Sequence, residues 1–353
     1  MLSAAIGLIM LVGSYGSAND TTFHTYAFDP ASGSATVRQS LARMDNPSFL
    51  AVADSGLTVL AVNENGGPGA SVTMMRRTRD DKYAYRPVTT VQTGGTDPCH
   101  IVVAPNGRYA VASNYSGGSI SIIPFDGSKA AFGEPSIVEF TGCGPVTDRQ
   151  SGPHAHFTSF TPDGRLMITN DLGSDKLHVF PLDKKGFPEI EDMYDIDIEP
   201  GSGPRHLVYD RSGKNVYLIN EISGTVTHLR YDKNNYSLTP LSYTLADYEH
   251  AGGSADIHLS PDGRFLYVTN RLKGDGIAIF AVSPDDGSLS AAGSISTGRH
   301  PRNFAITPDG RWLLVACRDD NRIEVFSRNP YDGSLTPTDN AILCPKPVCI
   351  VFQ

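Results

Sequence analysis

Short apolar runs recur along the chain about every fifty residues, each bounded by polar residues and a turn signal. A unit begins with a polar residue, continues through an apolar run, turns at Pro-Asp-Gly or a similar triplet, and enters a second apolar run. Apolar runs of this length predict β-strands, and the proline and glycine between them predict tight turns. The units begin with the segments 47–56, 98–107, 154–164, 204–213, 255–263 and 301–310.

Four predicted strands in each unit of about fifty residues are typical of a β-propeller blade. Six complete units leave one C-terminal strand, 347–352, with no strand after it, whereas 8–15, 23–28 and 36–41 provide a second, third and fourth strand at the other end. Joining the two ends makes a seventh blade and leaves no free sheet edge. The sequence therefore predicts an all-β, seven-bladed propeller that forms one domain over residues 1–353.

The N-terminal apolar segment has a second interpretation. Residues from Leu2 to Val12 are apolar and small, like the hydrophobic region of a signal peptide, but no Lys or Arg precedes them. Because the seventh blade needs this segment as a strand, we expect a strand and a cytoplasmic protein. A periplasmic protein whose leader has been trimmed is the alternative.

Charge and cysteine content exclude several classes of protein. The formal net charge is −9, which argues against a nucleic acid as partner. No run reaches the roughly 18 consecutive apolar residues of a membrane span. The five cysteines form no CxxC pair, and their odd number argues against a disulfide framework.

Polar residues recur at a fixed interval around the predicted ring. Fifteen residues separate His100 from Tyr115, and the same interval separates His206 from Glu221. Because the chain runs down the first strand of a blade and back up the second, such pairs lie at the same end of the propeller. The ring nearest the axis is predicted to be Phe49, His100, His156, His206, Asp256, Asn303 and Cys349. The ring outside it is predicted to be Tyr15, Glu64, Tyr115, Asp171, Glu221, Arg271 and Arg318.

Several arginines join the histidines and acids at this end, where Arg205 and Arg302 directly precede axis positions. Arginines gathered on an acidic protein indicate a local anion-binding site. The structural alternative is a hydrated polar channel in which asparagines cap turns. We predict no metal, because His154 and His156 lack a matching set of cysteines or carboxylates. The chain also lacks the GxSxG, phosphate-loop and dinucleotide motifs.

Three groups of residues carry a resemblance to a known family. They are Gly203-Pro204-Arg205-His206 with Asn220-Glu221, Ala255-Asp256-Ile257-His258 with Arg271, and His300-Pro301-Arg302. With these residues the chain resembles the propeller-type 6-phosphogluconolactonases over nearly its whole length, with muconate-cyclising lactonases as more distant relatives. The resemblance implies a carboxylic ester hydrolase that acts on a phosphorylated sugar δ-lactone without a cofactor. Residues 64–80 depart from the shorter form expected for the first blade.

The resemblance and the residue chemistry together predict roles. His156 or Glu221 is the general base, Glu221 on condition that burial raises its pKa. Arg271 stabilises the oxyanion, and Asp256 orients an arginine or a histidine. Substrate contacts are predicted for Arg205 and Arg302, which would hold the phosphate, and for His206, His100 and Arg318.

Two other classes of function fit the same residues. A cycloisomerase that closes a carboxylate onto a double bond needs a similar acid–base group and similar arginines. A non-enzymatic propeller could use the same end to bind a ligand. We expect the partner to be a small anionic sugar lactone, with neither nucleic acid nor membrane involved.

Overall fold

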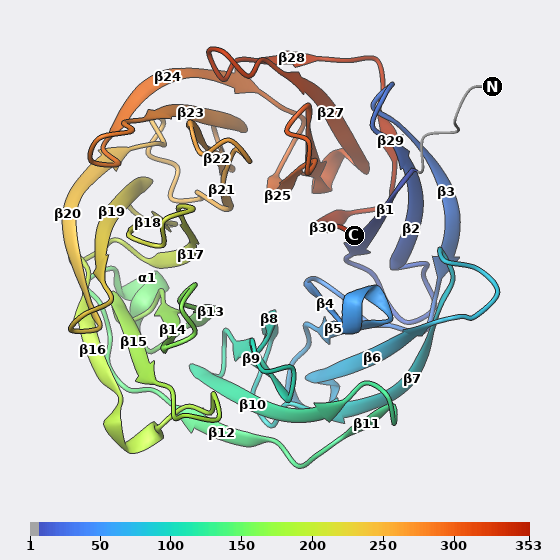
Figure 1. Ribbon diagram of the computed structural model, residues 1–353, viewed down its shortest axis with the longest axis horizontal. Helices are drawn as coiled ribbons and strands as arrows, with labels where there is room; N and C mark the ends of the chain where they lie inside the picture. The colour runs from blue at the N-terminus through green and yellow to red at the C-terminus, as the bar shows by residue number, and fades with distance from the viewer. Residues whose placement is uncertain (1–6) are drawn as a thin grey trace.

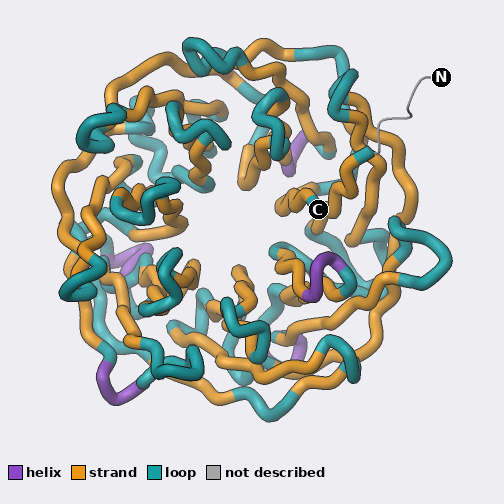
Figure 2. Tube along the Cα trace, viewed as in Figure 1, coloured by secondary structure: helices purple, strands orange, loops and turns teal. Residues whose placement is uncertain are grey.

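The strands form seven antiparallel sheets arranged in a ring (Figure 1). The structure is a computed structural model that describes residues 7–353. In each sheet one strand lies nearest the centre of the ring and the last lies at the rim, with loops at both ends (Figure 2). The predicted seven-bladed propeller is confirmed. Over the described residues there is one α-helix, α1 (Thr147–Gln150), and no helix is long and apolar enough to span a bilayer.

Blades 1 to 7 follow the chain from β4, and in each the strands occur in the order that the apolar pattern predicts. The innermost strands are β4 (Leu50–Ala53), β8 (Pro98–Val103), β13 (Ala155–Phe160), β17 (Pro204–Tyr209), β21 (Ile257–Leu259), β25 (Pro301–Ile306) and β30 (Pro347–Phe352). The second strands are β5 (Thr58–Asn63), β9 (Tyr109–Asn114), β14 (Leu166–Asp171), β18 (Asn215–Asn220), β22 (Phe265–Asn270), β26 (Trp312–Cys317) and β1 (Leu8–Ser14). Every residue of β5, β9, β14 and β22 is buried, because a second strand has neighbours on all sides.

The outer half of each blade is more exposed. The third strands are β6 (Ser71–Arg77), β10 (Ser119–Asp126), β15 (Lys176–Pro181), β19 (Thr225–Asp232), β23 (Gly276–Val282), β27 (Arg322–Arg328) and β2 (Phe23–Asp29). The rim strands are β7 (Tyr85–Gln92), β11 (Ala131–Phe132) with β12 (Ser136–Glu139), β16 (Tyr194–Asp197), β20 (Ser237–Leu245), β24 (Leu289–Ser296), β28 (Leu335–Pro337) with β29 (Ile342–Leu343), and β3 (Ser34–Leu41). Blades 2 and 6 thus divide the rim strand in two. In blade 2, Pro135 stands at the break, where it cannot donate to a ladder.

The two ends of the chain close the ring in blade 7. Strand β1 pairs antiparallel with β30, with Leu11 opposite Val351 and Gly13 opposite Cys349. In Figure 1 the blue β1 and the red β30 lie side by side. The strand predicted over residues 8–15 is therefore confirmed as β1, Leu8–Ser14, whereas residues 2–6 of the apolar segment lie outside the described residues.

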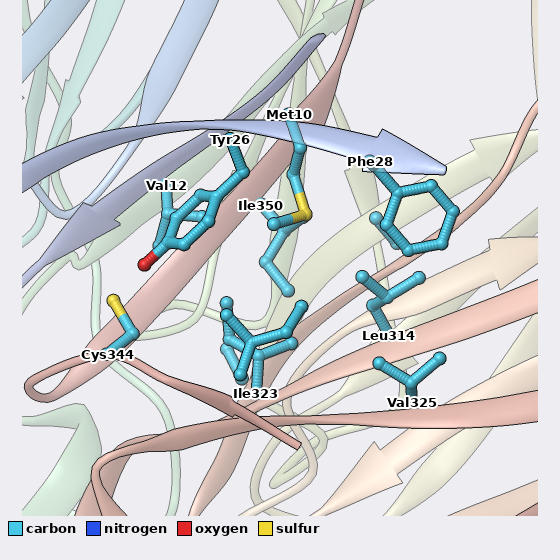
Figure 3. Packing of buried hydrophobic residues seen from close by; sticks show 12 residues of the cluster. Met10, Val12, Tyr26, Phe28, Leu314, Ile323, Val325, Cys344 and Ile350 are labelled. Atoms are coloured by element: carbon cyan, nitrogen blue, oxygen red, sulfur yellow. The ribbon is translucent and has the colours of Figure 1, made fainter. Parts of the chain in front are cut away.

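Apolar packing between blades holds the ring together. The described residues form seven clusters of buried apolar side chains, and each cluster joins two neighbouring blades. Figure 3 shows the cluster between blades 6 and 7, where Met10 and Phe28 pack with Leu314 and Val325. Each such side chain contributes about 1.5–3 kcal/mol on burial. The closing blade is therefore held by its neighbours as well as by its hydrogen bonds.

The Pro-Asp-Gly triplets make the turns between first and second strands. In blade 3, Asp163 Oδ1 accepts hydrogen bonds from Thr161 Oγ1 (2.7 Å) and from the Arg165 amide (3.2 Å). Gly164 has a φ of 66°, a conformation that glycine adopts without the strain of a side chain. These aspartates serve the turn, at the end of the blade opposite to the predicted site.

Candidate active site

A β-bulge lies near the start of the innermost strand in five blades. The extra residues are Cys99, His156, Arg205, Arg302 and Val348. A bulge leaves its residue outside the ladder and redirects the side chain, which is why bulges are common beside active sites. Three predicted site residues, His156, Arg205 and Arg302, therefore occupy equivalent positions at one end of the propeller.

The strand registers correct the predicted axis ring in blade 3. In blades 2, 4 and 6 the axis residue pairs with the residue thirteen positions later, as His206 does with Ile219. In blade 3 this pairing joins Phe157 to Asn170, so Phe157 and not His156 is the axis residue. The second strand starts two residues after its turn glycine in blade 3 as in blade 4, so both members of the predicted pair, His156 and Asp171, stand one residue too early in the chain. The fifteen-residue interval concealed this shift, because Phe157 and Leu172 are also fifteen residues apart. A shift of one residue moves a side chain to a different position in the blade.

Asp171 is also shifted from its predicted place. It is wholly buried, and its Oδ1 accepts hydrogen bonds from the amides of His154 (2.6 Å) and Gly173 (2.9 Å). Its Oδ2 accepts a hydrogen bond from Ser174 Oγ (2.5 Å). Asp171 thus supports the end of its blade, as the terminal asparagines do in other blades. The buried Leu172 takes the outer-ring position instead.

Aromatic rings surround the axis below the bulges. The ring centroid of His100 lies 4.3 Å from that of Phe49 and 4.2 Å from that of Phe157, and His206 lies 4.8 Å from Phe157. Burial lowers the pKa of His100 well below 6.5, and its Nδ1 accepts a hydrogen bond from the Thr158 amide (3.3 Å). His100 is therefore a neutral, packed residue of the axis, 3% exposed.

Three arginines surround the Glu221 carboxylate. Arg205 Nε donates to Oε2 (2.7 Å), and Arg271 Nη2 lies 3.2 Å from the same oxygen. Arg149 Nη2 donates to Oε1 (2.6 Å). Arg149 lies in α1, and its role was not predicted. The only signal in the sequence was the long stretch between the predicted last strand of blade 2 and the first strand of blade 3.

The condition for Glu221 as general base is not met. Burial by itself would raise the pKa of this carboxyl, but the three guanidinium groups outweigh burial and lower it to about 2. Glu221 is therefore ionised across the neutral range and is a very weak base. Its chemistry fits a group that positions arginines.

A chain of hydrogen bonds runs from Glu221 across the axis. Arg205, 1% exposed, also donates through Nη1 to the Ala255 carbonyl and to His206 Nε2 (3.2 Å). His206 Nδ1 in turn donates to Asp256 Oδ1 (2.8 Å). The predicted orienting role of Asp256 fits these contacts. The predicted direct phosphate contact of Arg205 does not fit, because the side chain is enclosed.

Asp256 is the most fully bonded acid of the site. Its Oδ2 accepts hydrogen bonds from His258 Nε2 (3.0 Å) and from Asn303 Nδ2. These partners outweigh burial and hold the pKa of Asp256 well below 3.8. For His206, burial and the Arg205 charge outweigh Asp256 and lower its pKa to about 4. A neutral His206 beside an ionised Asp256 is the resulting state at neutral pH.

A second acid–arginine group lies beside blade 1. The Tyr15 hydroxyl donates to Glu64, 2.9 Å from Oε2, and the Arg302 guanidinium lies 5.4 Å from the centre of the Tyr15 ring. Arg302 Nη2 is 3.7 Å from Glu64 Oε2, and its side chain is 16% exposed. Blade 1 therefore does contribute to the site, through Glu64. Arg302 remains accessible to a ligand.

His300 connects Arg271 with Arg318. Its Nε2 lies 3.4 Å from Arg271 Nη1, and its Nδ1 lies 3.2 Å from Arg318 Nη2. Burial and the two arginines lower the pKa of His300 to about 3. Arg318 also pairs with its neighbour Asp319 (2.7 Å). Arg318 is thus linked to Arg271 through His300, and among the described residues it forms no ion pair with Glu221.

His156 lies between the arginines and the axis. Its ring centroid is 5.3 Å from that of His206 and 5.5 Å from that of Tyr115, and its Nδ1 is 3.8 Å from Cys99 Sγ. Among the described residues no group forms a hydrogen bond with its Nε2. Burial, together with the Arg205 and His206 charges, lowers the pKa of His156 well below 6.5. His156 is thus a neutral imidazole with one free nitrogen.

Among residues 7–353 no group of three or more His, Cys, Asp or Glu side chains is arranged to hold a metal ion. His154 illustrates the reason. Its ring stacks on Tyr115, 4.6 Å between centroids, and its Nδ1 hydrogen-bonds with the Tyr115 carbonyl (3.0 Å). His154 is therefore turned toward Tyr115, whereas the His156 ring lies beside Cys99 and His206.

Relatives of the chain share its full length. A 6-phosphogluconolactonase of Formosa agariphila is 34% identical over 344 residues, which cover 92% of this chain and 94% of the relative. A 6-phosphogluconolactonase of Bacillus subtilis is 26% identical over 345 residues, 97% of each chain. The predicted enzyme class, a carboxylic ester hydrolase acting on lactones, is the class that these names carry.

Solved structures and a family model agree with these relatives. A crystal structure from Bacteroides fragilis has a TM-score of 0.93 and 40% identity, and covers 100% of this chain and 99% of that one. The periplasmic gluconolactonase of Pseudomonas aeruginosa has a TM-score of 0.87 and 30% identity, over 98% of both chains. A model described as lactonase, 7-bladed β-propeller, matches residues 9–352. The chain belongs to this lactonase family of seven-bladed β-propellers.

Proposed function

We propose that the protein hydrolyses 6-phospho-D-glucono-1,5-lactone to 6-phosphogluconate, a step of the pentose phosphate pathway. Several relatives carry the name of this enzyme. The observation that carries the proposal is the cluster of arginines around Glu221, beside a neutral His156, on a chain whose net charge is −9. Such a cluster suits a small anionic substrate.

In the proposed reaction, water attacks the lactone carbonyl carbon while His156 Nε2 takes its proton. Arg271 stabilises the oxyanion that forms on the carbonyl oxygen. When the ring C–O bond breaks, protonated His156 returns the proton to the leaving alcohol oxygen. Glu221 holds the arginines in place, and Asp256 with His206 fixes the position of Arg205. Arg302 contacts the phosphate, with Arg318 as an outer contact.

A hydrolysis assay against spontaneous ring opening tests the proposal. We expect faster opening of the phosphorylated lactone than of glucono-1,5-lactone, and no loss of rate on treatment with a chelator. Equal rates for the two lactones would rule out a phosphate contact. A protein that hydrolyses neither lactone but cyclises a muconate would be an isomerase, and one that does neither would be a binding propeller.

For the compartment we propose the cytoplasm. All five cysteines are free thiols, and Cys143 is exposed, which suits a reducing compartment. The periplasm is the alternative, because the similar gluconolactonase of Pseudomonas aeruginosa is a periplasmic protein. Cell fractionation followed by immunoblotting distinguishes the two.

A further inference from the structure

The three arginines on Glu221 differ in accessibility. The side chains of Arg205 and Arg271 are 2% and 6% exposed, whereas that of Arg149 is 36% exposed. The two buried arginines also donate to backbone carbonyls, Arg205 to that of Ala255 and Arg271 to that of Gly253. Among the described residues Arg149 has no backbone acceptor. It is the most exposed arginine of this group and offers the most surface to a ligand.

Arg149 comes from the longest connection between blades. Residues 140–154 join β12 to β13 and include α1. The other connections from a rim strand to the next innermost strand are 42–49, 93–97, 198–203, 246–256, 297–300 and 344–346. All of these connections lie at the end of the ring that carries the site. An extended connection with a cation at the site is where a propeller adds specificity to a common scaffold.

Gln150 anchors this connection. It is fully buried, its Nε2 donates to the Leu172 carbonyl (2.9 Å), and its Oε1 accepts from the Val146 amide (3.1 Å). The Gly144 amide donates to the Gln150 carbonyl (3.0 Å). The backbone next to Arg149 is therefore fixed, so the guanidinium is held near Glu221 without a rigid strand beneath it.

The guanidinium of Arg149 stays protonated and positively charged. Burial opposes it, but the Glu221 carboxylate and the Tyr115 hydroxyl outweigh burial and raise the pKa of the guanidinium. Burial opposes the charge of Arg302 too, but Tyr15 and Glu64 outweigh burial and raise the pKa of its guanidinium, with Glu221 as a smaller contribution. Glu221 therefore acts on both arginines, on Arg149 through a direct ion pair and on Arg302 more weakly.

We infer that Arg149 is a specificity-determining residue that binds the phosphate of the substrate together with Arg302. Arg149 thereby takes the role that was predicted for Arg205, whose side chain is enclosed. This inference rests on the proposed function and adds the residue that distinguishes phosphorylated from unphosphorylated lactones. A guanidinium can donate two parallel hydrogen bonds to a phosphate, which an ammonium cannot.

The test compares two lactones and two products. In Arg149→Gln we expect KM for the phosphorylated lactone to rise about tenfold to a hundredfold, in line with the loss of a charge-assisted contact. KM for glucono-1,5-lactone should stay within about twofold, and Arg149→Lys should recover part of the loss. Arg108→Gln is the matched control, because Arg108 is exposed in a turn at the opposite end of its blade. It should match the wild type on both lactones.

Calorimetry with 6-phosphogluconate and gluconate separates this inference from the proposed function. Weaker binding of 6-phosphogluconate alone by Arg149→Gln supports the inference even if hydrolysis is not observed. Hydrolysis by the wild type with unchanged KM in Arg149→Gln would overturn the inference and leave the proposed function intact. Equal losses for both lactones and both products would also overturn it, because they would show a general effect on Glu221.

Discussion

At the scale of single residues, some side chains of the site hold other side chains in position, and others face the ligand. Arg205 and Glu221 are enclosed and bond to each other (2.7 Å). His156 keeps one nitrogen free and is neutral, since burial lowers its pKa well below 6.5. A neutral imidazole accepts a proton readily enough to assist an activated ester, whereas a carboxylate held by three arginines does not.

His156→Asn should therefore lose about a hundredfold in kcat with little change in KM, because asparagine keeps the volume but cannot act as a base. Glu221→Gln should lose less in kcat and should raise KM, through looser arginines. Wild-type kcat should be flat around neutral pH and fall only well below pH 6.5, where His156 becomes protonated. Stopped-flow or pH-indicator assays measure these values. Full activity in His156→Asn would place the base elsewhere.

Arg302→Lys tests the second phosphate contact. The substitution keeps the charge of a side chain that is 16% exposed but removes the planar fork. We expect KM for the phosphorylated lactone to rise more than kcat falls. Steady-state kinetics with Arg108→Lys as control gives the comparison. An unchanged KM would remove Arg302 from the phosphate site.

At the scale of strands, the β-bulges and the closure of the ring determine the geometry of the site. A bulge recurs at the same point of the innermost strand in five blades, and in three of them it carries a predicted site residue. The blades thus have structurally equivalent positions that different residue types occupy, such as His156, Arg205 and Arg302. The same construction makes the site depend on a closed ring, because the bulges face one another only while the blades are held in a circle.

Deleting residues 347–353 should open the ring. The deletion removes the innermost strand of blade 7 and exposes the edge of β1, together with the apolar surface that Ile350 covers. We expect aggregation or loss of cooperative unfolding, measured by light scattering and thermal melts. Tyr331→Ala, at a side chain 82% exposed, is the control that should leave both unchanged. A truncated protein that stays monomeric and melts cooperatively would contradict the closure.

At the scale of the whole molecule, buried ionisable groups link stability to pH. The folded state lowers the pKa of His206 to about 4 from 6.5, and lowers that of Glu221 to about 2 from 4.5. His100 and His156 shift in the same direction as His206. Below pH 6.5 the unfolded chain then binds more protons than the folded one, so acid favours unfolding. His258, whose pKa is raised by Asp256, opposes this in part.

The free energy of unfolding should therefore be at its full value above pH 6.5 and decline as pH falls from 6.5 to 4, through the histidines. It should decline further between pH 4.5 and 2, because in this range the Glu221 carboxyl binds a proton in the unfolded chain but stays ionised in the folded protein. Urea titrations at pH 8, 6 and 4.5 measure it. The variant Arg108→Gln, at an exposed turn position, is the control that should keep the same pH dependence. Equal stability at pH 8 and 4.5 would show that the buried histidines are not neutral.

The sequence by itself determined the blades, because their strands follow local apolar runs and turn residues that no tertiary contact has to choose. It also indicated the closure, since β30 had no partner within its own unit. Arg271, Glu221 and Arg205 could be placed at one end by their spacing alone. Tertiary structure established the one-residue correction in blade 3 through the strand pairing, although the sequence held a signal for it, because Phe157 and not His156 stands seven residues before its turn glycine, as His206 does. It alone brought Arg149 to Glu221, because no periodicity relates a loop residue to a distant strand. It also decided the sign of the Glu221 pKa shift, because burial and three nearby charges act in opposite directions and only their distances determine which prevails.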